Sequence, residues 1–222
     1  MLAGVIFDFD GVIVDSHPIH LEAWKMFFNS IGQKIHDEDL AFIREGAKKE
    51  EILRRFLGDL TPEKIKLYGD EKEKLFKERG STLKLIQGFA SFLEQVDAAG
   101  LPSVVATSGS RKRIEEALDQ FRLRERFCAV VTGEDVAKGK PDPSLFYLAA
   151  RALHIKAENI LVCEDAVSGV GGAKKAGMKC LAIAINGREA DLKQAGADLV
   201  IADFTQVKLS DISKLFVGTQ NL

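Results

Sequence analysis

The chain has 222 residues, of which 46% are hydrophobic, so it can bury a substantial core in one large domain or two smaller ones. Its 31 lysines and arginines nearly balance 33 aspartates and glutamates, and the resulting charge of -2 offers no basic surface for nucleic acid or anionic lipid. The apolar runs are too short to span a membrane, and the N-terminus lacks the pattern of a signal peptide. We therefore expect a cytoplasmic protein with neither a nucleic-acid partner nor a membrane partner.

The three cysteines, Cys128, Cys163 and Cys180, lie inside apolar runs. They lack the paired spacing of a zinc site or of a disulfide framework. We expect all three to be small, reduced core residues, as in a reducing cytoplasm.

The first sixteen residues predict a strand that ends in acidic groups. Residues 2–7 form an apolar run, and Asp8, Asp10 and Gly11 follow it where a turn is expected. In an open parallel sheet, ligands bind at the carboxyl ends of the strands. On a continuing strand Asp8 and Asp10 would face the same side, so the pair would need a cation. Taken alone, the segment equally fits a strand that is capped by turn-forming residues.

Residues 16–87 show helical spacing of apolar residues and no strand pattern. Thr61 and Pro62 have the form of an N-cap and a first-turn proline. The spacing predicts helices over residues 19–31, 37–45, 48–57 and 62–79. The last helix is heavily charged, and we expect most of its charges to lie on a solvated face.

From residue 88 onward, helices and strands alternate. The pattern predicts strands over 103–107, 127–131, 160–163, 180–185 and 197–201, with helices over 89–99, 110–121, 141–153 and 168–176. Such alternation favours right-handed crossovers and a parallel sheet that is covered on both faces. We predict an α/β fold: a Rossmann-like, doubly wound core (1–15 and 88–222) with an inserted four-helix cap (16–87).

Short polar segments follow the predicted strands. Besides Asp8 and Asp10, these are Thr107, Ser108 and Gly109, then Lys140, and finally Glu164 and Asp165. Together they would place acids, a hydroxyl group and a lysine around one crevice. That set suits a phosphoryl group with Mg²⁺, a cation that prefers hard oxygen ligands. Taken separately, Ser108 and Gly109 could open a helix, Lys140 could be a surface cation, and the acidic pair could precede a helix.

The segment from Asp8 to Ser16 resembles the nucleophile motif of the haloacid dehalogenase superfamily, and the other segments resemble its remaining motifs in the same order. The helical insertion resembles the cap of its β-phosphoglucomutase and sugar-phosphatase branch. The resemblance implies that Asp8 attacks phosphorus, and that Asp10 donates and accepts the proton while its backbone carbonyl binds Mg²⁺. It implies that Asp8 and Asp165 are metal ligands and that Glu164 binds or supports the metal. Ser108, Gly109 and Lys140 would hold the phosphoryl oxygens.

The cap contains further candidates. His20 resembles a histidine that couples cap closure to the general acid, although a lone histidine is more often simply a surface or partly buried polar group. Lys49 stands where β-phosphoglucomutases typically carry an arginine for the second phosphate, and it cannot make the two-pronged contact of arginine. Lys48 and Lys49 keep a phosphonatase lysine possible, and Lys77 lies near another cap lysine of the branch.

We therefore expect a monomeric Mg²⁺-dependent phosphatase that hydrolyses a small phosphorylated metabolite, a sugar phosphate, through an aspartyl phosphate. The first alternative is β-phosphoglucomutase, which returns the phosphoryl group to the sugar, and a phosphonatase is a weaker one. A phospho-accepting receiver module also combines acids, a hydroxyl group and a lysine, but it usually lacks such a cap. A purely scaffolding protein would keep the fold without metal-dependent turnover.

Overall fold

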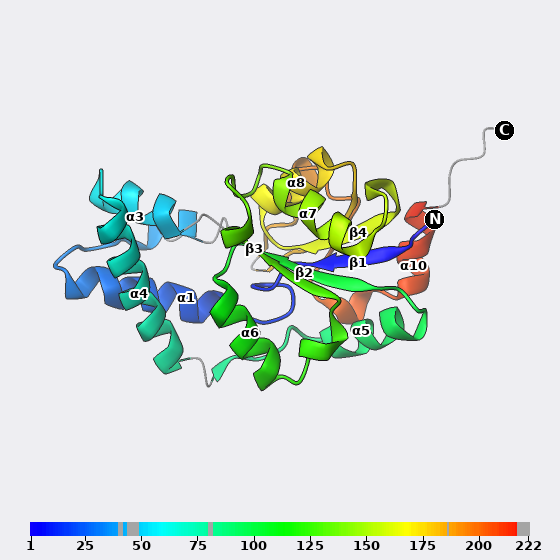
Figure 1. The fold of residues 1–222 in the computed structure, drawn as a ribbon, viewed down its shortest axis with the longest axis horizontal. Helices are drawn as coiled ribbons and strands as arrows, with labels where there is room; N and C mark the ends of the chain where they lie inside the picture. The colour runs from blue at the N-terminus through cyan, green and yellow to red at the C-terminus, as the bar shows by residue number, and fades with distance from the viewer. Residues whose placement is uncertain (40–41, 44–48, 80–81, 186, 217–222) are drawn as a thin grey trace.

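The computed structural model describes residues 1–39, 42–43, 49–79, 82–185 and 187–216. Figure 1 shows two parts: a twisted sheet between helices, and a separate group of helices at one end of it. The first strand, β1, lies in the middle of the sheet although it precedes the helical group in sequence. The helical group is thus an insertion after the first strand.

The sheet has six strands in the order β3-β2-β1-β4-β5-β6. Every pair of neighbouring strands is parallel, and Phe7 of β1 lies opposite Val105 of β2 and Cys163 of β4. The strands are β1 Gly4–Phe7, β2 Ser103–Thr107, β3 Ala129–Thr132, β4 Ile160–Glu164, β5 Lys179–Ile183 and β6 Leu199–Ile201. Parallel strands need crossover connections, which explains the helix between successive strands of the later chain.

Helices cover both faces of the sheet (Figure 1). Along β1, Val5 and Phe7 pack with one apolar cluster and Ile6 with the other, because successive side chains of a strand alternate between faces. On the first face lie α5 Phe89–Ala98, α6 Arg111–Gln120 and α10 Leu209–Ser213, and on the second lie α7 Ser144–Leu153, α8 Val167–Lys175 and α9 Glu189–Gln194. The architecture is the predicted Rossmann-like α/β core.

The inserted helices form a cap with its own apolar cluster. They are α1 His17–Ser30, α3 Lys49–Leu57 and α4 Pro62–Arg79, with a 3-10 turn at Asp37–Asp39. Trp24, Phe27 and Phe28 of α1 are buried against Ile52 and Leu53 of α3. Because helices α1 and α4 also pack along each other, the cap is a compact unit and not a loose loop.

Several details differ from the sequence predictions, among them helices α9 and α10, which were not predicted. The helix expected over 37–45 begins as a 3-10 turn at Asp37–Asp39, and part of that range lies outside the described residues. Cys163 and Cys180 are buried as expected, but Cys128 is exposed. Cys128 lies just before β3, the edge strand of the sheet, where the packing that buries the other two is missing.

Candidate active site

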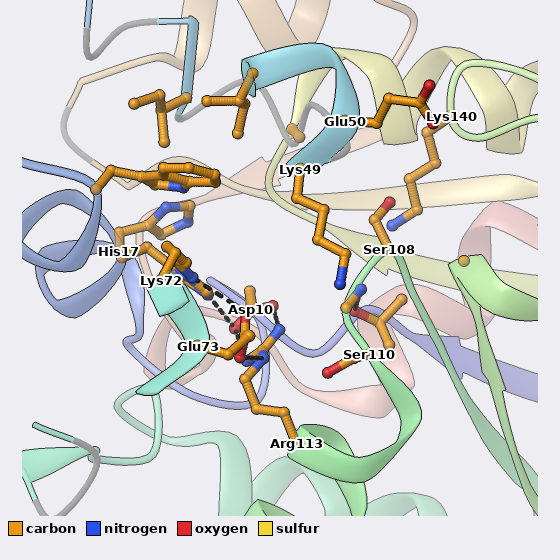
Figure 2. A pocket seen from close by; sticks show the side chains of 18 of the residues that line it. Asp10, His17, Lys49, Glu50, Lys72, Glu73, Ser108, Ser110, Arg113 and Lys140 are labelled. Carbon is orange, nitrogen blue, oxygen red and sulfur yellow. Dashed lines mark hydrogen bonds and ion pairs between the residues drawn. The ribbon is translucent and has the colours of Figure 1, made fainter. Parts of the chain in front are cut away.

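A pocket of about 350 Å³ lies between the carboxyl ends of the strands and the cap (Figure 2). The core contributes Asp8, Asp10, Ser108, Lys140 and Asp165 to its wall. The facing wall comes from the cap helices and is apolar in part, with Leu21, Trp24, Ile43, Ile52 and Ile65 beside charged groups. The polar segments that follow the strands therefore meet in one cavity, as the parallel topology requires.

At the floor of the pocket, Lys140 joins two carboxylates. Its ammonium nitrogen lies 3.1 Å from Asp8 Oδ1 and donates a short hydrogen bond to Glu164 Oε1. The side chains of Lys140 and Glu164 are almost completely buried. Burial lowers the pKa of Lys140, but the carboxylates of Asp8 and Glu164 outweigh that effect and hold it above the usual range. Lys140 is therefore a permanent cation next to Asp8.

The Asp8 carboxyl group lies in an environment that disfavours its charge. Burial raises its pKa to about 7, with Glu164 and Asp10 adding to the rise and Lys140 opposing it. The atom Asp8 Oδ1 is buried, with the Lys140 ammonium group 3.1 Å away as its ion-pair partner. One ammonium thus only partly compensates the acids around Asp8, and further positive charge would favour the ionised form.

The geometry also fits a bound cation. Carboxylate oxygens of Asp8, Glu164 and Asp165 all lie within 4.8 Å of one another. Carboxylate oxygen donors of this kind suit a hard divalent ion. The Asp10 carboxylate is not part of this group and contacts Ser16, His20 and Arg113 instead.

Local sequence features hold Glu164 and Asp165 in place. Glu164 ends β4, and its Oε2 accepts hydrogen bonds from the backbone N–H groups of Asp165 and Ala166, at 3.0 and 3.1 Å. Gly169 in the following helix leaves the space that the Glu164 side chain fills, since a Cβ at this position would overlap it. Gly169 thus serves the packing of Glu164.

The Asp10 carboxylate is surrounded by hydrogen-bond donors. Arg113 of α6 donates to both oxygens, at 2.9 Å to Oδ1 and 2.6 Å to Oδ2. Oδ1 also accepts from the Ser16 hydroxyl group at 2.5 Å and lies 3.3 Å from His20 Nε2. Burial raises the pKa of Asp10, but Arg113 and His20 outweigh it and bring the pKa well below its usual range. In this arrangement Asp10 is a carboxylate.

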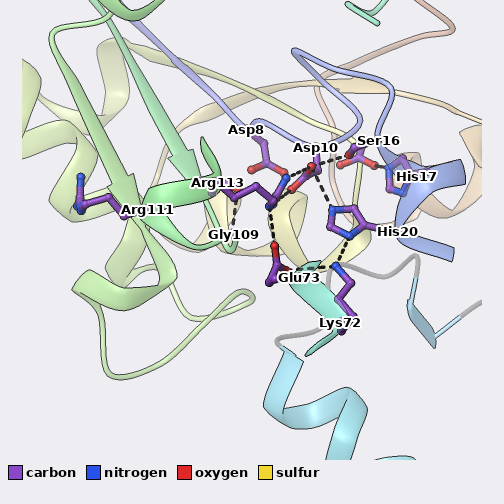
Figure 3. Close-up of polar contacts among 12 residues, drawn as sticks. Asp8, Asp10, Ser16, His17, His20, Lys72, Glu73, Gly109, Arg111 and Arg113 are labelled. Carbon is purple, nitrogen blue, oxygen red and sulfur yellow. Dashed lines mark hydrogen bonds and ion pairs between the residues drawn. The ribbon is translucent and has the colours of Figure 1, made fainter. Parts of the chain in front are cut away.

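The cap reaches Asp10 through His20 and Lys72 (Figure 3). Lys72 Nζ lies 2.7 Å from His20 Nδ1 and 3.3 Å from Glu73 Oε1, and its side chain is buried beside Trp24 and Phe76. Burial lowers the pKa of His20 to about 4, and the neighbouring Lys72 adds to this. Because His20 is then neutral, Lys72 donates to Nδ1 and Nε2 carries the hydrogen that faces Asp10.

Ser108 and Gly109 line the pocket on the core side. They follow β2, and Gly109 N–H donates to Thr107 Oγ1 at 3.2 Å, which fixes the turn. A Cβ at position 109 would overlap the Arg113 guanidinium, so glycine is needed where the arginine passes. The arrangement leaves the Ser108 side chain directed into the cavity near Lys140 (Figure 2).

Lys49 extends from the start of α3 into the pocket (Figure 2). Its chain crosses Gly69 of α4, where an added Cβ would lie 3.1 Å from Lys49 Cδ and 3.4 Å from Nζ. Lys48 lies outside the described residues. The other lysine considered from the sequence, Lys77, is exposed and pairs with Glu116 of α6 at 3.0 Å. The lysine of α4 that lines the pocket is Lys72.

Among the pocket residues that were not singled out from the sequence, four make charged contacts within the site: His17, Lys72, Glu73 and Arg113. His17, the first residue of α1, lies 2.7 Å from Asp165 Oδ2, and this contact outweighs burial and raises the pKa of His17 to about 9. One feature of the sequence could have indicated that Arg113 lies near the pocket. It lies in the first turn of the helix that follows Ser108, and helical side chains point back toward the N-terminus.

Comparison with known proteins agrees with this fold and pocket. The sequence pattern of the haloacid dehalogenase-like hydrolases matches residues 5–183, and the chain therefore belongs to this family of capped α/β enzymes. It is 34% identical over 183 residues to a phosphorylated carbohydrates phosphatase of Thermotoga maritima, covering 80% of this chain and 83% of that protein. It is also 30% identical over 239 residues to a β-phosphoglucomutase of Mycobacterium bovis, covering 91% and 90%.

Solved structures show the same fold. The structure of a β-phosphoglucomutase from Clostridium difficile superposes with a TM-score of 0.87 at 22% identity and covers 97% of each chain. At that identity the likeness concerns the fold alone. Within the described residues, none of the helices combines the length and the apolar character that a membrane span requires.

Proposed function

We propose that the protein is a Mg²⁺-dependent phosphatase that hydrolyses a sugar phosphate through an aspartyl phosphate on Asp8. One observation carries this proposal: the buried Asp8 carboxylate lies 3.1 Å from a buried lysine and next to two further carboxylates, inside a pocket. Such an arrangement makes a nucleophilic carboxylate compatible with an incoming phosphate dianion, because cations offset the repulsion.

In the first half of the reaction, an Asp8 oxygen attacks phosphorus and the ester P–O bond breaks. Asp10 gives a proton to the departing oxygen, so that the product leaves as an alcohol. Lys140 and Ser108 hold the phosphoryl oxygens, with backbone N–H groups of the turn at Gly109. Asp10 is a carboxylate in the substrate-free arrangement, so its contacts with Arg113 must loosen and it must take up a proton from water before it can donate one.

In the second half, water attacks the phosphorus of the aspartyl phosphate and gives its proton to Asp10. The bond between Asp8 and phosphorus breaks, and inorganic phosphate leaves. The same carboxyl group thus serves as acid and then as base. The cap covers the pocket during this cycle and limits the entry of bulk water.

Asp8, Asp165 and the Asp10 backbone carbonyl would hold Mg²⁺, with Glu164 as a ligand or as a support through its contacts with Lys140 and the Asp165 amide. When bound, Mg²⁺ supplies positive charge that stabilises the charge developing on the phosphoryl oxygens. The grouping of the Asp8, Glu164 and Asp165 carboxylates supports this assignment.

The size of the pocket and the relatives support a small phosphorylated metabolite as substrate. A cavity of about 350 Å³ lies in the lower range for small-molecule sites. The Thermotoga maritima relative is a phosphorylated carbohydrates phosphatase, and an Escherichia coli relative with 30% identity is a hexitol phosphatase. We propose a cytoplasmic monomer with the core at 1–15 and 88–222 and the cap at 16–87.

A β-phosphoglucomutase activity is the second candidate, since a relative with 30% identity has that name. A mutase must hold two phosphate groups at once. On the cap side the pocket offers Lys49 where arginine would give a planar two-pronged contact. The phosphatase is therefore the better-supported activity.

One assay separates these activities. The purified protein is incubated with a panel of sugar phosphates and Mg²⁺, or with EDTA, while free phosphate and the isomerisation of β-glucose 1-phosphate are measured in parallel. We expect metal-dependent phosphate release without isomerisation. Isomerisation that requires a trace of bisphosphate primer would favour the mutase, and no metal-dependent turnover on any ester would refute the proposal.

A further inference from the structure

One edge of the sheet has backbone groups that face away from the rest of the protein. β3 is the first strand in the sheet order, with β2 as its single neighbour. Cys128 N–H donates to Ser103 O of β2, and the pairing then continues one residue at a time along both strands. Because backbone groups alternate in direction along a strand, those of Ala129 and Val131 point away from β2. Their N–H and C=O groups have no hydrogen-bond partner within the described part of the chain.

This edge strand lacks the features that usually protect an exposed edge. β3 has the sequence Ala-Val-Val-Thr and contains neither a charged residue nor a proline. Native proteins commonly place such residues on an exposed edge, where they prevent pairing with another chain. An edge without them is suited to accept an additional strand.

A groove lies beside this edge, on the face of the sheet that α7 covers. Its volume is about 960 Å³, larger than that of the active-site pocket. Val131 of β3 forms one side of it, and Tyr147, Leu148 and Ile155, from α7 and the turn after that helix, line the other. The side chain of Tyr147 is 47% exposed. This edge groove therefore places an apolar surface next to the unpaired backbone of β3.

The charged side chains of the edge groove leave an excess of positive charge. The acidic residue that lines it, Asp135, accepts a hydrogen bond from Arg111 Nη2 at 2.7 Å. Arg151 in the last turn of α7 and Lys156 in the turn that follows are exposed, and neither forms an ion pair within the described residues. Two cations thus remain available to carboxylates of an occupant.

These features together favour one kind of occupant. A small anion would satisfy the two cations but would leave the strand edge and the apolar surface uncovered. A second copy of the chain, paired symmetrically through β3, would bring Arg151 and Lys156 close to the same cations of the other copy, and like charges across an interface are costly. An extended acidic peptide satisfies the backbone, the apolar surface and the cations at once.

We propose that the edge groove binds an acidic, extended segment of a partner protein as an additional strand beside β3. The backbone of the segment pairs with Ala129 and Val131, an apolar side chain lies against Leu148 and Ile155, and carboxylates lie beside the two cations. In this mode of recognition, backbone hydrogen bonds supply affinity and side-chain contacts supply specificity. Arg151 and Lys156 do not line the active-site pocket, so the binding does not depend on the proposed phosphatase function.

The test uses the synthetic peptide acetyl-Thr-Glu-Thr-Val-Thr-Glu-Thr-amide. Its sequence is the same in both directions, so a parallel and an antiparallel strand present the same side chains to the groove. When the central valine faces the apolar surface, a glutamate lies on each side of it, because alternate residues of a strand share a face. The same peptide with lysine in place of glutamate is the matched control. Binding is measured by calorimetry, and hydrogen exchange of the Ala129 and Val131 amides is followed by NMR.

We expect the glutamate peptide to bind at least about tenfold more tightly than the lysine peptide. At saturation it should slow hydrogen exchange of the Ala129 and Val131 amides by about tenfold or more. Arg151→Glu should weaken binding about tenfold. Lys193→Glu, which also lies in the last turn of a helix but on α9, should leave binding unchanged.

A second variant tests the backbone contact alone. Ala129→Pro removes an N–H group that faces away from β2, a position at which edge strands tolerate proline. It should also weaken binding about tenfold, while the thermal unfolding temperature stays close to that of the wild type. If this variant does not fold, Arg151→Glu and the exchange of the two amides still decide the question.

Three results would overturn the proposal. The first is no binding of the glutamate peptide up to about 1 mM. The second is equal binding of both peptides, or binding that leaves the exchange of the Ala129 and Val131 amides unchanged. The third is protection of these amides in the free protein that increases with protein concentration, because a second copy of the chain would then be the occupant.

Discussion

The two walls of the pocket are built in different ways. On the core wall, Asp8, Lys140 and Glu164 follow the ends of parallel strands and touch one another directly. On the cap wall, Lys49 and Lys72 project from helices, and the link to Asp10 passes through intermediate side chains. The sheet thus fixes the reacting groups, whereas the cap can adjust the side chains that they meet. Changes on the core wall should therefore abolish turnover, and changes on the cap wall should modulate it.

The largest effect is expected for Asp8→Asn. The amide is a poor nucleophile, so turnover should fall by more than about a thousandfold, as nucleophile loss does in other enzymes. The thermal unfolding temperature should not fall, because the pocket loses a buried charge among other acids. Phosphate release and thermal unfolding are the measurements, with exposed Asp119→Asn as control. Near-normal turnover, with deamidation back to aspartate excluded by mass spectrometry, would show that Asp8 is not the nucleophile.

The next effect is expected for Lys140→Met. Removing a cation that touches the phosphoryl group costs about a hundredfold in turnover, comparable to loss of an oxyanion-stabilising donor. The variant also leaves Asp8 and Glu164 without their buried partner, which should destabilise the metal-free protein by about 3 kcal/mol. Denaturant unfolding with EDTA and with Mg²⁺ measures this change. A variant as stable and active as the wild type would contradict the role of Lys140.

A smaller effect on the cap wall is expected for Lys49→Met. This exposed lysine points into the pocket, so it should contribute to binding more than to chemistry. KM for a sugar phosphate should rise about tenfold, equivalent to about 1.4 kcal/mol, while kcat changes little. Lys74→Met, exposed on α4, is the matched control. A fall in kcat at constant KM would instead place Lys49 in the chemical step, as a phosphonatase requires.

A further prediction concerns the pH dependence of stability. Burial lowers the pKa of Lys72 from 10.5 to about 8. Between these values the unfolded chain binds a proton that the folded chain does not, so the free energy of unfolding contributed by Lys72 rises with pH across this window. Relative to Lys72→Met, the wild type should gain thermal stability from pH 8 to pH 10. A constant difference between the two proteins would contradict the lowered pKa.

The residues of the core wall could be predicted from the sequence because the ends of the strands can be located in it. An apolar run that stops at acids, followed by alternating strands and helices, places those acids at one edge of a sheet. The proximity of Asp8, Lys140 and Asp165 could be predicted without knowing how any helix is rotated about its axis.

The side chains of the cap that face the pocket could not be predicted in the same way. Helix α4 carries many charges, and hydrophobic periodicity does not say which of Lys72 and Lys77 faces the pocket. The packing decides: Lys72 is buried beside Trp24 and Phe76, whereas Lys77 reaches the surface and Glu116. Likewise, the rings of Phe9 and Phe76 select Arg113 from three consecutive basic residues, and these contacts join distant parts of the chain.

The most direct test is to trap the covalent phosphate. Wild-type protein with Mg²⁺ is mixed with its fastest sugar phosphate, quenched in acid during turnover and treated with borohydride, which reduces an aspartyl phosphate to homoserine. Peptide mass spectrometry then locates the change. Our account predicts homoserine at position 8 and nowhere else. Modification at another residue, or turnover without any trapped phosphate at Asp8, would contradict it.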